Sequence, residues 1–195
     1  KIKGVGDVIT GRVEQGTINS GDVCRVVPRG LSGLKVFSIE MHHKTWPCAK
    51  PGDNVGMNMK GLDKNNMPKV GDVITLEKDP LCLPVKSFVA QVAVQEHPGQ
   101  LKPGFSPCVH VRTAKSACKM TAINWKISKK TGDQKLENPP FLERAEQAEI
   151  VFEPQQPIYI EEFEKCEGLG RIAVMDSNNL VMLGKVMSVE YKPYK

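Results

Sequence analysis

A turn signal that recurs through the first part of this chain limits what the chain can fold into. Gly-Asp stands just before a valine four times, at 6–8, 21–23, 52–55 and 71–73. Glycine and aspartate are typical of tight turns, and each pair leads into a short apolar segment of strand length. The residues between the pairs differ, so they do not form a repeat family. The pattern predicts short strands in a meander or barrel.

The rest of the chain shows the same organisation. No long stretch has helical periodicity, and the best helical candidate, 141–148, is too short to support a helix. We therefore predict an all-β fold, either sandwich or barrel. Two prolines between Asp79 and Pro84 favour extended backbone and indicate a boundary. The predicted organisation is a domain at 1–80, a linker at 81–85 and a second domain at 86–195.

Period-two alternation assigns the faces of three expected strands. In 35–42 the core face is predicted to hold Phe37, Ile39 and Met41. The opposite face is predicted to hold Val36, Ser38, Glu40 and His42. After the turn at 51–53, the predicted core residues are Val55, Met57 and Met59. In 8–13, Ile9 and Val13 point inward, whereas Val8, Thr10 and Arg12 point outward. Three segments therefore place polar groups outside a barrel, and alternation alone does not bring them together.

The net charge of +5 is unevenly distributed along the chain. Residues 97–136 contain eight Lys or Arg and one Asp, whereas residues 137–170 contain nine Glu and two basic residues. One interpretation is two solvated faces whose charges neutralise each other. The other is a basic strip that binds a phosphate backbone. Charge alone slightly favours the first.

Several classes of function are disfavoured by what the sequence lacks. It has no phosphate-binding glycine loop, no Gly-x-Ser-x-Gly elbow and no His-Glu-x-x-His helix. The six cysteines form no Cys-x-x-Cys pair, so no zinc site is predicted, and we expect free thiols in a reducing compartment. No apolar run is long enough to span a membrane, and no secretion leader is visible. A binding module without catalytic or metal-ligating residues is the prediction.

Three motifs together resemble a known family. They are Val8-Ile9-Thr10-Gly11-Arg12-Val13-Glu14-Gln15-Gly16, Ile39-Glu40-Met41-His42-His43 and Pro51-Gly52-Asp53-Asn54-Val55-Gly56. Their order and spacing resemble the second domain of the translation elongation factors EF-Tu and elongation factor 1-alpha. Further on, Glu96-His97-Pro98-Gly99-Gln100, Thr113-Ala114 and Leu169-Gly170-Arg171 resemble the third domain of the eukaryotic form. The resemblance covers essentially the whole chain and implies two consecutive antiparallel β-barrels.

The resemblance also implies a function and a set of binding residues. It implies that a GTPase domain, with GTP and magnesium, precedes these barrels in a cytoplasmic protein. The implied partners are aminoacyl-tRNA, the ribosome, a nucleotide-exchange factor and that GTPase domain. In the second domain, the residues implied to hold the aminoacylated 3′ end are Val8, Thr10, Glu40, His42 and Asn54. In the third, those implied to hold the T-stem are Arg112, Thr113 and Lys115, through phosphate and 2′-OH contacts.

The chain also departs from the family pattern. Met175 stands where the family usually has Arg, which would remove one charge-assisted contact to RNA. The implied function is delivery of aminoacyl-tRNA to the ribosome by a GTP-dependent factor. Two alternatives remain open: the barrels of a release or ribosome-rescue GTPase, and a scaffold that binds other proteins.

Overall fold

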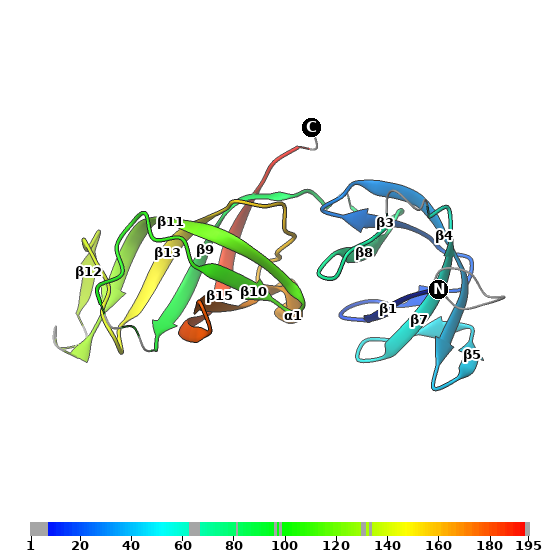
Figure 1. Ribbon diagram of the computed structural model, residues 1–195, viewed down its shortest axis with the longest axis horizontal. Helices are drawn as coiled ribbons and strands as arrows, with labels where there is room; N and C mark the ends of the chain where they lie inside the picture. Colours follow the sequence, from blue (N-terminus) through cyan, green and yellow to red (C-terminus); the bar gives the residue numbers. More distant parts are fainter. Residues whose placement is uncertain are drawn as a thin grey trace. The chain divides into compact units, whose positions relative to one another are not determined.

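The computed structural model describes residues 8–62, 67–80, 82–95, 97, 99–129, 132 and 134–193. It divides into two compact units, residues 1–82 and 83–195. Both are built almost entirely from antiparallel strands (Figure 1), and the predicted fold class, two consecutive antiparallel β-barrels, is confirmed. The Gly-Asp pair at 6–7 lies outside the described residues, as does Leu81 of the predicted linker.

The first unit consists of short strands around a small apolar core. Its strands are β1 (Val8–Arg12), β2 (Ile18–Asn19), β3 (Val23–Val27), β4 (Leu31–Met41), β5 (Lys44–Trp46), β6 (Cys48–Ala49), β7 (Asn54–Lys60) and β8 (Val73–Leu76). The main sheet has the order β1-β7-β4-β3-β8, with β5 paired to β4, and β2 pairs separately with β6. The predicted core residues Val55, Met57 and Met59 are buried, and Ile9 and Val13 pack against them.

Three of the Gly-Asp pairs form the same turn before β3, β7 and β8. In each, the glycine has a positive φ of 95–98°, a conformation that favours glycine. The aspartate carboxylate accepts a hydrogen bond of 2.8 Å from the backbone N–H three residues earlier, and the aspartate N–H donates back to that residue's carbonyl. The aspartates are Asp22, Asp53 and Asp72. These three predicted turns are confirmed.

The predicted faces of β4 are wrong at two positions. Val36 is fully buried, whereas Phe37 is 57% exposed. The cause is a β-bulge, because the register with β7 shifts between Val36 and Ser38. A bulge inserts one extra residue and so reverses the alternation on one side of it. Beyond the bulge the prediction holds, with Ile39 fully buried and Met41 partly buried.

The second unit closes into a ring. Its elements are β9 (Val85–Val94), β10 (Cys108–Val111), β11 (Ala114–Ile127), β12 (Lys135–Glu137), β13 (Gln147–Pro154), α1 (Glu167–Gly170), β14 (Arg171–Asp176) and β15 (Asn179–Tyr191). The sheet order is β10-β14-β15-β9-β13-β11-β12, and β10 also pairs with β11, so six strands form a closed barrel. Its core includes Phe88 of β9 stacked on its cross-strand partner Phe152 of β13.

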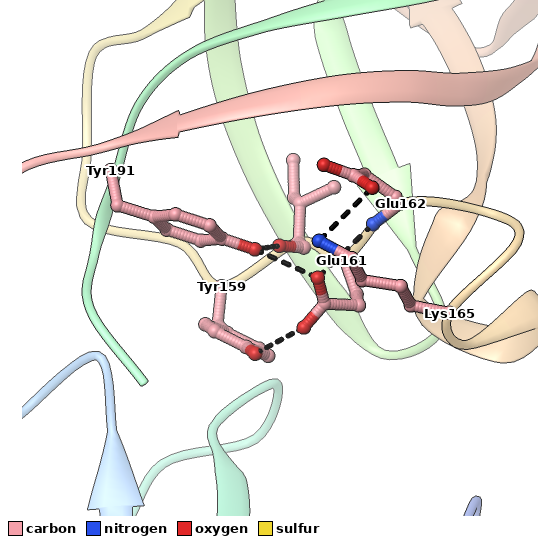
Figure 2. A network of polar contacts seen from close by, with 6 residues as sticks. Tyr159, Glu161, Glu162, Lys165 and Tyr191 are labelled. Atoms are coloured by element: carbon pink, nitrogen blue, oxygen red, sulfur yellow. Dashed lines mark hydrogen bonds and ion pairs between the residues drawn. The ribbon is translucent and has the colours of Figure 1, made fainter. Parts of the chain in front are cut away.

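A polar network ties the segment between β13 and α1 to the last strand (Figure 2). Tyr159 and Tyr191 both donate to the carboxylate of Glu161, at 2.6 and 2.9 Å. Burial raises the pKa of Tyr191 above its usual range, and the nearby Glu161 charge raises it further.

In the part of the chain that the structure describes, no helix is long and apolar enough to cross a membrane. The helix α1 has only four residues.

Candidate nucleic-acid interface

Three strands of the first unit bring Thr10 and Glu40 onto one face of the sheet. Thr10 of β1 lies directly opposite Gly56 of β7, and Gly56 lies directly opposite Glu40 of β4. Residues directly opposite in antiparallel strands share a face. The three therefore form a row across the sheet, with a glycine between a hydroxyl and a carboxylate. The sequence motifs named these residues, and the pairing register brings them together.

Gly56 makes the centre of this row shallow. A Cβ added to Gly56 would lie 3.3 Å from the Cγ1 of Val8 and 3.9 Å from the carbonyl oxygen of Glu40. Val8 thus stands over the glycine from the neighbouring strand. Because no side chain rises from Gly56, its backbone and the overlying Val8 side chain form a low floor between Thr10 and Glu40. A flat ligand can approach the sheet closely only at such a position.

Asn54 lies at the start of β7, on the same face as Gly56. It stands opposite Arg12 of β1, one row away from Thr10. The turn before it is fixed to β1, because Val13 N–H donates to the Asp53 carbonyl and Gly52 N–H donates to the Val13 carbonyl, both at 2.9 Å. Asn54 is exposed, so its amide is available to a ligand at this end of the face.

His42 does not lie on a strand, contrary to the prediction that it shares a strand face with Glu40. Strand β4 ends at Met41, which pairs with Lys44 of β5, so His42 and His43 are the two residues of a tight hairpin loop. Both have positive φ, 51° and 61°, as a two-residue loop of this kind requires. His42 is exposed and lies two residues beyond Glu40, which ends the Thr10–Gly56–Glu40 row. The loop conformation, rather than strand alternation, sets the direction of its side chain.

The second unit presents its three predicted residues together on another hairpin. Val111 of β10 pairs with Ala114 of β11, so Arg112 and Thr113 form a two-residue loop, with Arg112 at φ 52°. Lys115 follows on β11, and all three are exposed. Met175 lies on β14, the other neighbour of β10, opposite Cys108. Cys108 begins β10 and the loop follows its last residue, so position 175 lies at the opposite end of the β10–β14 pair from this loop.

The basic strip predicted from residues 97–136 is neutralised in part. Lys126 is buried and its Nζ lies 3.0 Å from Glu146 Oε1, while Lys135 Nζ lies 3.0 Å from Glu137 Oε1. Lys119 stands directly opposite Glu153. Lys130 lies outside the described residues. Part of this positive charge therefore meets the glutamates of 137–170. The Arg112–Lys115 loop, meaning Arg112, Thr113 and Lys115, is the part of the strip that the family resemblance singles out.

Gly56 was quoted in the motif at 51–56 but was not named as a binding residue from the sequence. The signal was present in β7, where Asn54, Gly56 and Asn58 alternate with three buried apolar residues. A glycine on the outer side of an otherwise regular strand marks a close approach by another group. Among the described residues, no three His, Cys, Asp or Glu side chains gather as a metal site would require.

Two consecutive antiparallel β-barrels with these turns and strands define the class of translation-factor barrel domains. The profile "Elongation factor Tu domain 2" matches residues 6–75, and "GTP-eEF1A C-terminal domain-like" matches residues 87–187. The chain belongs to the family of EF-Tu and elongation factor 1-alpha.

Individual relatives agree with this assignment. The chain is 39% identical over 191 residues to elongation factor 1-alpha of Methanosarcina mazei and 40% identical over 191 residues to that of Methanocorpusculum labreanum. It is covered to 98% in both comparisons and spans 44% of each relative. The structure of sup35 complexed with GDP is similar over 97% of this chain and 45% of its own, with a TM-score of 0.86 at 27% identity.

Proposed function

We propose that this chain is the tRNA-binding part of a GTP-dependent factor that delivers aminoacyl-tRNA to the ribosome. The observation that carries the proposal is the row Thr10–Gly56–Glu40 with Val8 above the glycine. GTP and magnesium would be bound by residues outside this chain, in a cytoplasmic protein that also meets a nucleotide-exchange factor.

The row suits the terminal adenosine of an aminoacyl-tRNA. An unpaired base is recognised by stacking and by hydrogen bonds to its edges, and both need a surface that the base can reach. The low floor at Gly56 allows that approach, the Val8 side chain on it offers apolar contact to the base or sugar, and the Glu40 carboxylate accepts hydrogen bonds from amine or hydroxyl groups. The chemistry of each side chain and its place in the row support these roles, which the family resemblance implies.

The esterified amino acid would lie beside the adenosine. Thr10 borders the floor on the side of β1, and Asn54 stands one row further along the same face. The exposed His42 loop lies at the end of β4, two residues from Glu40, and would contribute backbone groups. An ester with a free amine carries both donors and acceptors, which hydroxyl, amide and backbone groups can satisfy without selecting a particular amino-acid side chain.

The Arg112–Lys115 loop would hold the T-stem. A-form RNA offers phosphates and 2′-hydroxyls rather than readable base edges, and a two-residue loop with Arg, Thr and a nearby Lys supplies cations and a hydroxyl at an exposed tip. Met175 favours a second candidate, the barrels of a release or rescue GTPase, because a methionine where the family usually has Arg removes one charge-assisted contact to phosphate.

Substitution of Glu40 tests the proposed function directly. In the GTP-bound full-length protein, Glu40→Arg should weaken the binding of charged tRNA at least tenfold, since hydrogen bonds to a charged group contribute about 1.5–3 kcal/mol. The matched control is Glu77→Arg, which makes the same charge change at an exposed residue after β8. If Glu40→Arg and Glu77→Arg both bound charged tRNA as tightly as the unmodified protein does, the proposed site would be contradicted.

A further inference from the structure

A second surface feature lies on the same sheet face as the Thr10–Gly56–Glu40 row. Lys35 of β4 stands directly opposite Lys60 of β7. Phe37, two residues beyond Lys35, is 57% exposed, and the Nζ of Lys60 lies 4.2 Å from the centroid of its ring. We call Lys35, Phe37 and Lys60 the Phe37 patch. It combines an exposed aromatic ring with two cations.

The bulge that exposes Phe37 is held firmly by the turn beside it. Ser20 Oγ donates to the carbonyl of Phe37 at 2.9 Å. Gly21 N–H donates to the carbonyl of Val36 at 2.8 Å, and Val36 N–H donates to the carbonyl of Asp22 at 2.9 Å. The backbone on both sides of the extra residue is therefore fixed. A hydrogen-bonded bulge therefore directs Phe37 outward. Bulges of this kind change the direction of a side chain and are frequent next to functional sites.

The charges of the Phe37 patch suit an anion. Like charges directly opposite each other in a sheet are destabilising, so the Lys35–Lys60 pair costs the folded unit free energy that a bound phosphate would relieve. Asp22, from the adjoining turn, directs its carboxylate at Asn19 rather than toward the lysines. An aromatic ring beside two cations is the combination with which proteins bind unpaired nucleic acid, through base stacking and phosphate contacts.

The patch is continuous with the proposed adenosine site. Between the two lies one further row of the same face, Val8–Asn58–Ser38. Along β7, the rise of about 3.3 Å per residue puts Lys60 about 13 Å from Gly56. On this face of β7 and β4, the only side chains between the Phe37 patch and the Thr10–Gly56–Glu40 row are those of Asn58 and Ser38, which are small. An extended single-stranded nucleic acid can therefore follow the sheet from one to the other.

We propose that the Phe37 patch is a subsite for the unpaired nucleotides that precede the terminal adenosine, with a base stacked on Phe37 and phosphates bound by Lys35 and Lys60. The identity of the RNA rests on the proposed function, whereas the chemistry of the patch rests on the contacts above. The subsite would lengthen the recognised part of the 3′ end beyond the adenosine.

Three probes separate this subsite from the adenosine site. They are a non-hydrolysable 3′-aminoacyl adenosine, an RNA trinucleotide ending in that group, and the same trinucleotide without the aminoacyl group. Each is titrated into the 195-residue chain at fixed salt and followed by NMR. Phe37→Ala should weaken the binding of both trinucleotides about tenfold, as loss of one stacked base implies, and leave the aminoacyl adenosine unchanged. Phe37→Leu, which keeps an apolar side chain without a ring, should behave like Phe37→Ala.

The lysines are tested by the salt dependence of trinucleotide binding. Lys60→Gln should make the slope of log affinity against log salt shallower by about 0.7, the value for one phosphate contact with single-stranded nucleic acid. Lys69→Gln, at an exposed position in the turn before β8, is the matched control and should leave the slope unchanged.

The outcomes distinguish failure of the subsite from failure of the proposed function. Equal binding of the acylated and free trinucleotides, both weakened by Phe37→Ala, would support the subsite and count against recognition of the aminoacyl group. Trinucleotide affinities unchanged by Phe37→Ala would overturn the subsite, as would the absence of trinucleotide binding by the unmodified chain. If Phe37→Ala instead weakened the binding of an acidic protein segment and left the trinucleotides unaffected, the subsite would also be overturned. The patch would then be assigned to a protein partner.

Discussion

The two barrels use their strands differently. In the second unit, the described strands β10, β14, β15, β9, β13 and β11 pair into a closed ring around 22 buried apolar residues. In the described part of the first unit, the main sheet runs from β1 to β8 without pairing of these end strands, around 9 buried apolar residues. The first unit has the smaller core, and it carries the face on which Thr10, Gly56 and Glu40 form a row. The second unit has the larger core, and its candidate binding residues lie together at the hairpin between β10 and β11.

Charges show the same contrast. The second unit buries an ion pair, Lys126–Glu146, with side chains 9% and 5% exposed. Lys126 also donates to the Phe141 carbonyl, and Glu146 accepts from the Glu143 N–H. The first unit directs Glu40, Lys35 and Lys60 outward instead. The second unit therefore uses one charged pair in its interior, whereas these three charged residues of the first unit lie on its outer face.

The largest expected effect is in the second unit. Lys126→Met should lower its free energy of unfolding by about 3–5 kcal/mol, because Glu146 would keep its burial without its partner. The matched control is Lys135→Met in the exposed pair with Glu137, where about 1 kcal/mol or less is expected. Equal effects of the two substitutions would show that burial of the first pair has no energetic consequence.

Two buried cysteines report the units separately in that experiment. Burial raises the pKa of Cys24 in the first unit to about 11 and that of Cys118 in the second to about 12. Both thiols therefore react slowly at pH 8 unless their unit opens. Lys126→Met should speed the labelling of Cys118 and leave that of Cys24 unchanged. Acceleration at Cys24 as well would mean that the units unfold together.

An intermediate effect is expected on binding by the first unit. Gly56→Val would fill the floor between Thr10 and Glu40, and its Cβ would press on Val8 at 3.3 Å. Charged-tRNA affinity should fall at least tenfold, whereas stability should change by less than about 1 kcal/mol, since valine suits a strand. Gly11→Val, where an added Cβ meets nothing within 4 Å, is the control. A Gly56→Val protein that binds charged tRNA normally would exclude the floor as a contact surface.

The smallest expected effect concerns the turn that positions Asn54. Asp53→Ala removes the acceptor of the Lys50 N–H and should cost the first unit about 1 kcal/mol. Urea unfolding followed through Cys24 labelling measures it. The second unit, followed through Cys118, should be unaffected. A loss of several kcal/mol would mean that this turn holds the sheet together rather than only its end.

The sequence predicted the two barrels and the turns better than it predicted side-chain directions. Local chemistry sets a Gly-Asp turn, and the described turns at Asp22, Asp53 and Asp72 form as expected. A bulge depends on pairing between strands, so the exposure of Phe37 and the burial of Val36 could not be read from alternation. The burial of Lys126 was hidden for the same reason, because its partner Glu146 lies 20 residues away.

The candidate site was predicted residue by residue through family resemblance, whereas its arrangement came from register. Pairing through β7 brings Thr10 and Glu40 into one row and shows that Gly56 separates them. Pairing of β4 with β5 moves His42 from a strand to a loop, which two adjacent histidines without glycine or asparagine gave little reason to expect.

The central claim, that the outer face of the first unit recognises an aminoacylated 3′ end, is tested most directly by one comparison. The full-length protein in its GTP form is titrated with charged and deacylated forms of the same tRNA at one stated salt concentration, because phosphate contacts make affinity salt-dependent. The account predicts clearly tighter binding of the charged form and loss of that preference in Glu40→Arg. Equal affinity for the two forms would contradict it.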